Sequence, residues 1–245
     1  MASKKRAVAA ESADAAAVIA SLKRLANKKV RDGMARYGIP NDHALGISVA
    51  TLRQLAKKLG ENHALALKLW DSGIYEARML ASFVAEPAKL TSAQMDRFCR
   101  DFDNWAICDT MAFALFDRSP HAFAKIEAWS KKSAEFEKRA AFALLASVAL
   151  HDKSATNAAF VKTLPLIERA ADDQRNFVKK GVSWALRSIG GRNLDLCQAV
   201  MELATKLANS ADATGRWVGK DALRDLSRPV VQKKLRARAR VATRS

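Results

Sequence analysis

Apolar residues recur along the chain with the spacing of amphipathic helices. Between residues 177 and 189, Val178, Val182, Ala185 and Ile189 fall on one side of a helix at about 100° per residue. Alternating runs rich in Val, Ile and Thr, which would predict strands, are missing, and the chain has only two Tyr. The pattern therefore predicts an all-α protein.

Five helical stretches share one frame, in which an aromatic residue opens an apolar helix. The stretches are 75–84, 105–116, 136–145, 177–186 and 217–226. Three positions after the aromatic residue, four of them carry a basic residue, and the fifth carries a cysteine: Arg78, Cys108, Arg139, Lys180 and Lys220. The starts at 75, 105, 136, 177 and 217 are 30, 31, 41 and 40 residues apart. Such periods are typical of two-helix solenoid repeats of the HEAT type.

The intervals between these stretches leave room for one further helix each. We expect those helices at 91–102, 120–130, 156–170 and 194–208. The first begins with a capping box, in which Thr91 and Gln94 each bond the backbone of the other. The sequence thus predicts a curved, right-handed, all-α solenoid of HEAT-like two-helix repeats.

The predicted solenoid forms a single domain over residues 19–231. Residues 1–18 are basic and then Ala-rich, and we expect a flexible N-terminal tail there. Residues 232–245 are predicted to form a basic C-terminal tail.

The helix faces opposite the apolar stripes carry aromatic and charged residues. Trp105 and Asp109 are four residues apart and share one such face. The two following repeats contribute Arg139, Lys180, Trp184 and Arg187. Taken singly, each Trp could be core, each cation a solvated residue, and Asp109 a cap or ion-pair partner. Their coincidence on consecutive repeats instead favours one basic groove with two indoles and a single acid.

Charge indicates the partner of that groove. The chain holds 42 Lys and Arg against 25 Asp and Glu, a net charge of +17. Such a chain repels itself unless it works near polyanions, and nucleic acid is the natural one because each neutralised phosphate releases a counterion.

Other chemistries find little support in the residues. Cys99, Cys108 and Cys197 form no CxxC pair and are expected to be free thiols in a reducing compartment. The four His are scattered, so we expect no metal and no cofactor. The segment 215–221, "GRWVGKD", is one residue too short for a phosphate-binding loop and has Asp221 where Ser or Thr should stand. No apolar run reaches membrane-spanning length, and we expect a cytoplasmic monomer.

Four segments resemble the AlkD-like DNA alkylation repair proteins, a family of HEAT-like-repeat DNA glycosylases. They are "MARYG" (34–38), "NWAICD" (104–109), "KRAAF" (138–142) and "FVKKGVSWALR" (177–187). The resemblance runs from about residue 20 to about residue 230, with the segments in order and in register with the repeats.

The resemblance implies a monofunctional glycosylase that excises positively charged N3- or N7-alkylated purines from double-stranded DNA in base excision repair. It implies that Asp109 is catalytic, stabilising an oxocarbenium-like sugar and orienting water. Contacts to the lesion and its sugar are implied for Trp105, Trp184 and Tyr37. Phosphate contacts are expected from Arg139, Lys179, Lys180 and Arg187. On DNA, the protein would associate with the nucleoid.

The chain departs from the family pattern in two places, which bear on lesion range. Asn104 stands where well-known members have a second Trp, and Asn176 and Phe177 stand where they can have a pair of aromatic residues. Two alternatives stay open: a non-catalytic HEAT protein that binds distorted or branched DNA, and a HEAT scaffold for protein partners. The first differs from a glycosylase at Asp109.

Overall fold

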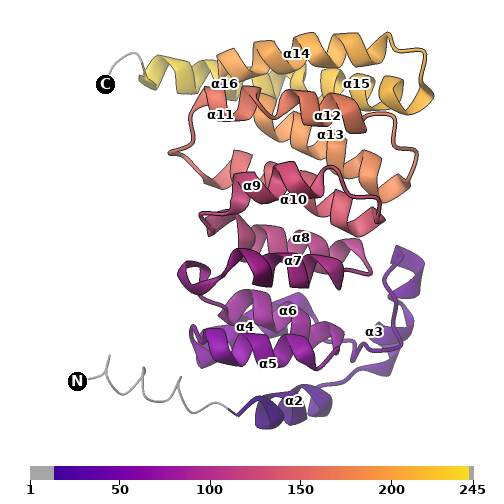
Figure 1. Ribbon diagram of the computed structural model, residues 1–245, viewed down its shortest axis with the longest axis vertical. Coiled ribbons are helices and arrows are strands. Elements are labelled where there is room, and N and C mark those ends of the chain that lie inside the picture. The colour runs from indigo at the N-terminus through magenta and orange to yellow at the C-terminus, as the bar shows by residue number, and fades with distance from the viewer. Residues whose placement is uncertain (1–13, 243–245) are drawn as a thin grey trace. The chain divides into compact units, whose positions relative to one another are not determined.

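The computed structural model describes the backbone of residues 14–242 (Figure 1), and within that range it contains helices and no strand. The chain divides into two compact units between Pro120 and His121. Each unit is a set of helices packed against their neighbours in the chain. The all-α prediction is confirmed over the described residues.

The first unit contains seven α-helices and three short 3₁₀ helices among its described residues, and α5 pairs with α6. Its elements are α2 (Ala15–Arg24), α3 (Lys28–Asp32), η1 (Ala35–Tyr37), α4 (Val49–Leu59), α5 (His63–Asp71), α6 (Tyr75–Val84), η2 (Pro87–Lys89), α7 (Ser92–Arg100), α8 (Trp105–Ala114) and η3 (Phe116–Arg118). Helix α6 packs against α4, α5 and α8. Buried rings fill the centre: Trp70 lies 4.5 Å from Phe98, which stacks on Phe116 at 6.5 Å between centroids.

The second unit is built around α10. Its elements are α9 (Ala122–Trp129), α10 (Glu135–His151), α11 (Asn157–Val161), α12 (Leu164–Ala170), α13 (Asn176–Gly190), α14 (Leu194–Ala208), α15 (Ala213–Leu226) and α16 (Pro229–Ala242). Helix α10 packs between α9 and α13, and α15 packs on α13 and α14. Every residue from 139 to 149 is buried, so α10 is enclosed on all sides rather than on one stripe.

The predicted helices are present. Helix α6 has the predicted bounds, and α14 covers the predicted 194–208. The capping box of α7 is also confirmed, since Gln94 N donates to Thr91 Oγ1 at 3.1 Å and Thr91 N donates to Gln94 Oε1 at 2.8 Å. The helix predicted at 156–170 is instead broken into α11 and α12. Pro165, in the first turn of α12, lacks the N–H that a continuous helix would need there.

Helices reach into both predicted tails within the described residues, and the tail boundaries stay predictions. Helix α2 begins at Ala15 and buries Val18, while residues 1–13 lie outside the described part. At the other end, most of the predicted basic tail is helix α16, which buries Leu235. The single domain predicted over 19–231 stays a prediction.

Helices α14 and α15 approach each other through Gly219. A Cβ atom at this position would lie 2.3 Å from the backbone N of Ala208 and 2.5 Å from the carbonyl oxygen of Ala204. Both atoms belong to the α14 backbone, which cannot rotate aside as a side chain could. The contact therefore requires glycine.

Gly219→Ala is expected to lower the free energy of unfolding by about 1–3 kcal/mol, the usual cost of overpacking. Gly215→Ala, in the same helix, is the matched control, because the nearest atoms to its new Cβ lie 3.4–3.6 Å away. That variant should be neutral or up to about 1 kcal/mol more stable, since alanine favours helix. Urea unfolding followed by circular dichroism measures both, and equal midpoints for the two variants would contradict the close approach.

Candidate active site

Helix α8 presents Trp105 and Asp109 one turn apart, and both are half-buried. Ile107 and Met111 are buried on the other side of the helix, as the apolar spacing predicts. Asn104 explains where the helix starts. Its Oδ1 accepts hydrogen bonds from the backbone N–H groups of Ala106 and Ile107, both at 3.0 Å. The residue that departs from the family pattern is thus the N-cap that places Trp105 in the first turn.

Trp105 is joined to Tyr37 by a hydrogen bond. The indole Nε1–H donates to the carbonyl oxygen of Tyr37 at 2.8 Å, which fixes the ring against η1. The Tyr37 side chain is 58% exposed, and the Arg36 guanidinium lies 4.8 Å from its ring centroid. The structure therefore brings together two of the aromatic residues that only the resemblance had connected.

A buried carboxylate holds the loop that follows Tyr37. Glu76 of α6 is fully buried, and its Oε2 accepts from the backbone N–H of Leu45 at 2.7 Å. Its Oε1 accepts from Gly46 at 2.7 Å and from Ile47 at 3.2 Å. Sequence reasoning missed Glu76. The available signal was an acid four residues before Leu80, in phase with the buried side of α6.

Gly46 completes this loop. Its φ of 80° lies in the left-handed region, and a Cβ there would lie 2.2 Å from the carbonyl oxygen of Asn27. The loop therefore combines a glycine that permits the turn with a carboxylate that binds its N–H groups.

A pocket of about 140 Å³ lies between this loop, α6 and α8, with Asp42, Tyr75 and Asp103 among its lining residues. Burial, together with the charges of Glu76 and Asp103, raises the pKa of Tyr75 to about 12. The phenol is consequently neutral at physiological pH and available as a hydrogen-bond donor.

Arg139 is not exposed as its helix face predicted, and its phosphate contact stays a prediction. Its side chain is buried, 6% of the residue being exposed, and Nη1 donates to the carbonyl oxygen of Phe177 at 2.7 Å. The bond ties α10 to the start of α13. Arg78, in the equivalent position of an earlier repeat, likewise donates to the carbonyl oxygens of Trp70 and Asp101, both at 3.4 Å.

Helix α13 carries the other predicted phosphate contacts, in different environments. Lys180 is exposed and has no acidic partner among the described residues, whereas Lys179 Nζ lies 5.4 Å from the Trp217 ring centroid. Arg187 is paired, with Nε 3.3 Å from Asp221 Oδ2 and Nη1 3.8 Å from Asp225 Oδ2.

Trp184 is half-buried on the same helix. Trp105, Asp109 and Tyr37 belong to the first unit, and the α10 and α13 residues belong to the second. The groove predicted from all of them stays a prediction, as do the DNA-contacting roles of its members.

Comparison with known proteins settles the family. A family model described as DNA alkylation repair enzyme matches residues 18–226. The chain belongs to this family. The resemblance found in the four segments is therefore confirmed.

A solved structure described as a new family of proteins related to the HEAT-like repeat DNA glycosylases with affinity for branched DNA structures shares the fold of this DNA alkylation repair family member. Its TM-score is 0.72 at 17% identity, covering 87% of this chain and 95% of that one. The HEAT-like repeat fold is thereby confirmed. A designed armadillo repeat protein in complex with the peptide (KR)4 aligns with a TM-score of 0.38 at 15% identity, covering 77% of this chain and 79% of its own. No curated protein sequence matches.

The described residues contain neither a membrane-spanning helix nor a cluster of metal-binding side chains. No helix among them is long and apolar enough to cross a membrane. Nor do residues 14–242 hold a group of three or more His, Cys, Asp or Glu side chains suited to a metal ion. The three cysteines are buried and form no disulfide within the described residues.

Glu76→Gln should lower the free energy of unfolding of the first unit by about 2–4 kcal/mol. The amide keeps one acceptor oxygen and points an NH₂ donor at a backbone N–H. Glu61→Gln is the control, because it removes the same charge from an exposed position between α4 and α5. Thermal melts give the stability, and hydrogen exchange of residues 38–47 reports the loop. Unchanged exchange in the Glu76 variant would show that the carboxylate does not hold it.

Proposed function

We propose that this protein is a DNA glycosylase that excises cationic N3- or N7-alkylated purines from duplex DNA. Membership of the DNA alkylation repair enzyme family supports the substrate class. The observation that carries the chemistry is a carboxylate, Asp109, one helical turn from an indole that is itself fixed by the Tyr37 carbonyl. A positively charged sugar is the group that such a pair would stabilise.

The leaving group explains why so few residues are needed. An alkylated purine carries a positive charge, so the bond between its nitrogen and C1′ of the deoxyribose is already weakened. When that bond breaks, its electron pair neutralises the base and leaves positive charge on the sugar. Asp109 stabilises this charge and orients water toward C1′, and the water proton passes to solvent.

The aromatic residues add to this stabilisation. The indole face of Trp105 suits a cationic sugar or base, a contact worth roughly 0.5–2 kcal/mol. Tyr37 lies beside it with an exposed ring. We assign Trp184 the same kind of contact, on the strength of the family resemblance.

Duplex DNA is bound mainly through its phosphates. The net charge of +17 supports this, and Lys180 is the predicted phosphate ligand that is both exposed and without an acidic partner in the described chain. Lys179 joins it on the same turn of α13. The bonds of Arg139 and Arg187 within the protein favour positioning roles for these two residues.

The second candidate function is binding of branched DNA without excision. It is favoured by the description of the solved structure that shares this fold, although that likeness extends to the fold alone. The two functions share a need for basic residues and differ in their need for Asp109.

Asp109→Asn is expected to lower excision of methylated purines by about two orders of magnitude or more, the scale for loss of one electrostatic contributor. Affinity for DNA should hold or rise, because a negative charge leaves a surface that binds phosphate. Single-turnover release of methylated purines from methylated duplex DNA is the measurement. Glu61→Gln, in the same unit, controls for the change in net charge.

The outcomes separate the candidates. Wild-type excision that disappears in the Asp109 variant supports the glycosylase. Wild-type protein that binds branched DNA tightly yet releases no base supports the second function. Efficient release of neutral bases such as uracil would contradict the chemistry, because a neutral leaving group needs an acid that the proposal does not supply.

Lys180→Ala should reduce the salt dependence of DNA affinity by about one phosphate contact. Arg187→Ala should instead lower stability by about 1 kcal/mol, because it leaves Asp221 and Asp225 without this partner. Lys131→Ala is the control for net charge, since Lys131 is paired with Glu127 on α9. Fluorescence anisotropy at several salt concentrations gives the slopes, and a slope for Lys180→Ala equal to that of the control would contradict the assignment.

A further inference from the structure

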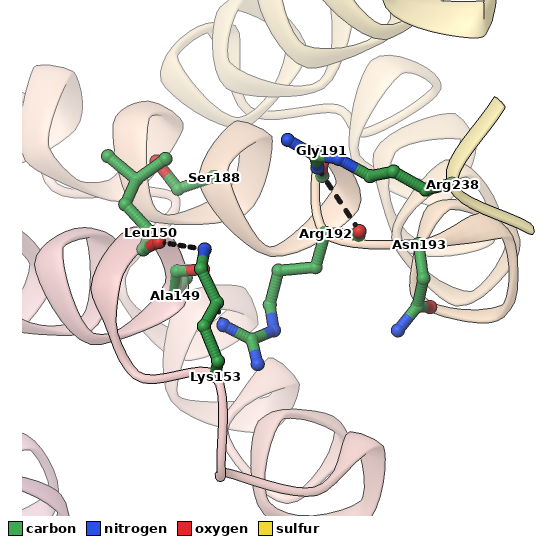
Figure 2. A pocket seen from close by; sticks show the side chains of 8 residues that line it. All are labelled: Ala149, Leu150, Lys153, Ser188, Gly191, Arg192, Asn193 and Arg238. Carbon is green, nitrogen blue, oxygen red and sulfur yellow. Dashed lines mark hydrogen bonds between the residues drawn. The ribbon is translucent and has the colours of Figure 1, made fainter. Parts of the chain in front are cut away.

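A pocket of about 280 Å³ lies in the second unit, at the ends of α10 and α13. Three cations line it, and each comes from a different segment: Lys153 follows α10, Arg192 follows α13, and Arg238 belongs to α16 (Figure 2). None of its lining residues is acidic. Ser188 lies eight residues after Lys180 on α13, roughly 12 Å along the helix axis, so this pocket is separate from the Lys180 contact.

Each of the three cations donates a hydrogen bond to a backbone carbonyl oxygen. Arg192 Nη1 donates to the carbonyl oxygen of Ala149 at 2.6 Å, and Arg238 Nη1 donates to that of Gly191 at 2.7 Å. Lys153 Nζ donates to the carbonyl oxygen of Leu150. Cations at the C-terminal ends of helices are favourable, and these bonds satisfy carbonyl groups that the helices leave open.

Arg238 and Lys153 hold more donors than these bonds use, whereas Arg192 also donates Nη2 to the carbonyl oxygen of Ala155 at 3.2 Å. A guanidinium has five N–H groups, and the bonds of Arg238 to Gly191 and Arg192 all involve Nη1. Burial lowers the pKa of Arg192, the charge of Arg238 lowers it further, and Asp152 opposes both. Two guanidinium groups that repel each other across a pocket would be stabilised together by an anion between them.

Helix α16 continues the positive charge away from the pocket. Its apolar side buries Leu235, while Lys233, Lys234 and Arg236 are exposed. A second depression of about 520 Å³ on this helix is lined by Lys233, Arg236 and Arg240, again without an acid. Cations along a helix of 14 residues suit an extended polyanion rather than one small ion.

We propose that the pocket formed by Lys153, Arg192 and Arg238, together with the exposed cations of α16, is a second binding site for the phosphodiester backbone of duplex DNA. The proposal rests on the proposed function only in taking DNA as the partner. A phosphate enters the pocket between the cations, and the adjoining phosphates follow α16. Such a site adds affinity for DNA of any sequence and leaves the chemical step to Asp109.

The test compares wild-type protein with Lys153→Gln/Arg238→Gln on undamaged duplex DNA. Lys131→Gln/Lys132→Gln removes the same charge from cations of the same unit that are paired with Glu127 and Glu137, and is the matched control. The pocket variant should lose about two phosphate contacts from the salt dependence of the affinity, and the control should keep the wild-type slope. Single-turnover excision at saturating protein should be unchanged.

Single variants test whether misfolding explains the result, and melts with inorganic phosphate test whether the pocket binds a small anion instead. Lys153→Gln and Arg236→Gln are tested singly, because neither removes the bond from Arg238 to Gly191, and each should lower the slope by about one contact. Inorganic phosphate is added in thermal melts of wild type and the pocket variant.

The proposal is overturned if the pocket variants show the same salt dependence of DNA affinity as the control. The proposal is also overturned if inorganic phosphate stabilises the wild-type protein while the pocket variants keep the wild-type salt dependence of DNA affinity. That result would favour a small-anion site. Wild-type protein that fails to bind DNA at all would contradict the proposed function itself, a result distinct from either.

Discussion

The first unit depends on the fully buried carboxylate of Glu76. Glu76 binds three successive backbone N–H groups of the loop 45–47, and a buried carboxylate is stable only when its lone pairs are used in this way. This attachment fixes the chain at residues 45–47, at the far end of the loop that begins after Tyr37. The Tyr37 carbonyl can then serve as a fixed acceptor for the Trp105 indole. The candidate active site on α8 is therefore positioned from a residue on α6 that takes no part in its chemistry.

Sequence predicts well what is determined locally. The capping box of Thr91, the apolar stripe of α13 and the bounds of α6 follow from spacing alone, because each depends on residues within a few turns. The family resemblance added Tyr37, which no local pattern connects to Trp105. Glu76 escaped prediction because its partners lie 29–31 residues away, in a loop without periodicity.

The position three residues after the opening aromatic residue of each repeat holds a cation in four repeats, and these cations lie in different environments. Arg78 and Arg139 occupy it in two repeats. Arg78 donates to the carbonyl oxygens of Trp70 and Asp101, and Arg139 donates to that of Phe177 in α13. Lys180 and Lys220 occupy it in later repeats and are exposed. A guanidinium can satisfy a buried carbonyl while an ammonium is more readily hydrated, so the choice of cation separates the structural positions from the solvent-facing ones. Helical periodicity alone cannot make that distinction.

The buried middle of α10 makes the second unit prone to aggregation when it opens. Residues 140–149 read "AAFALLASVA", without a charge, a proline or a glycine, and all of them are buried. Such a segment contains no charged residue or proline that would oppose aggregation. Partial opening of the second unit therefore exposes an aggregation-prone segment. We expect heat inactivation to follow the rate at which α10 is released and aggregates, so that the working lifetime of the protein is a kinetic property.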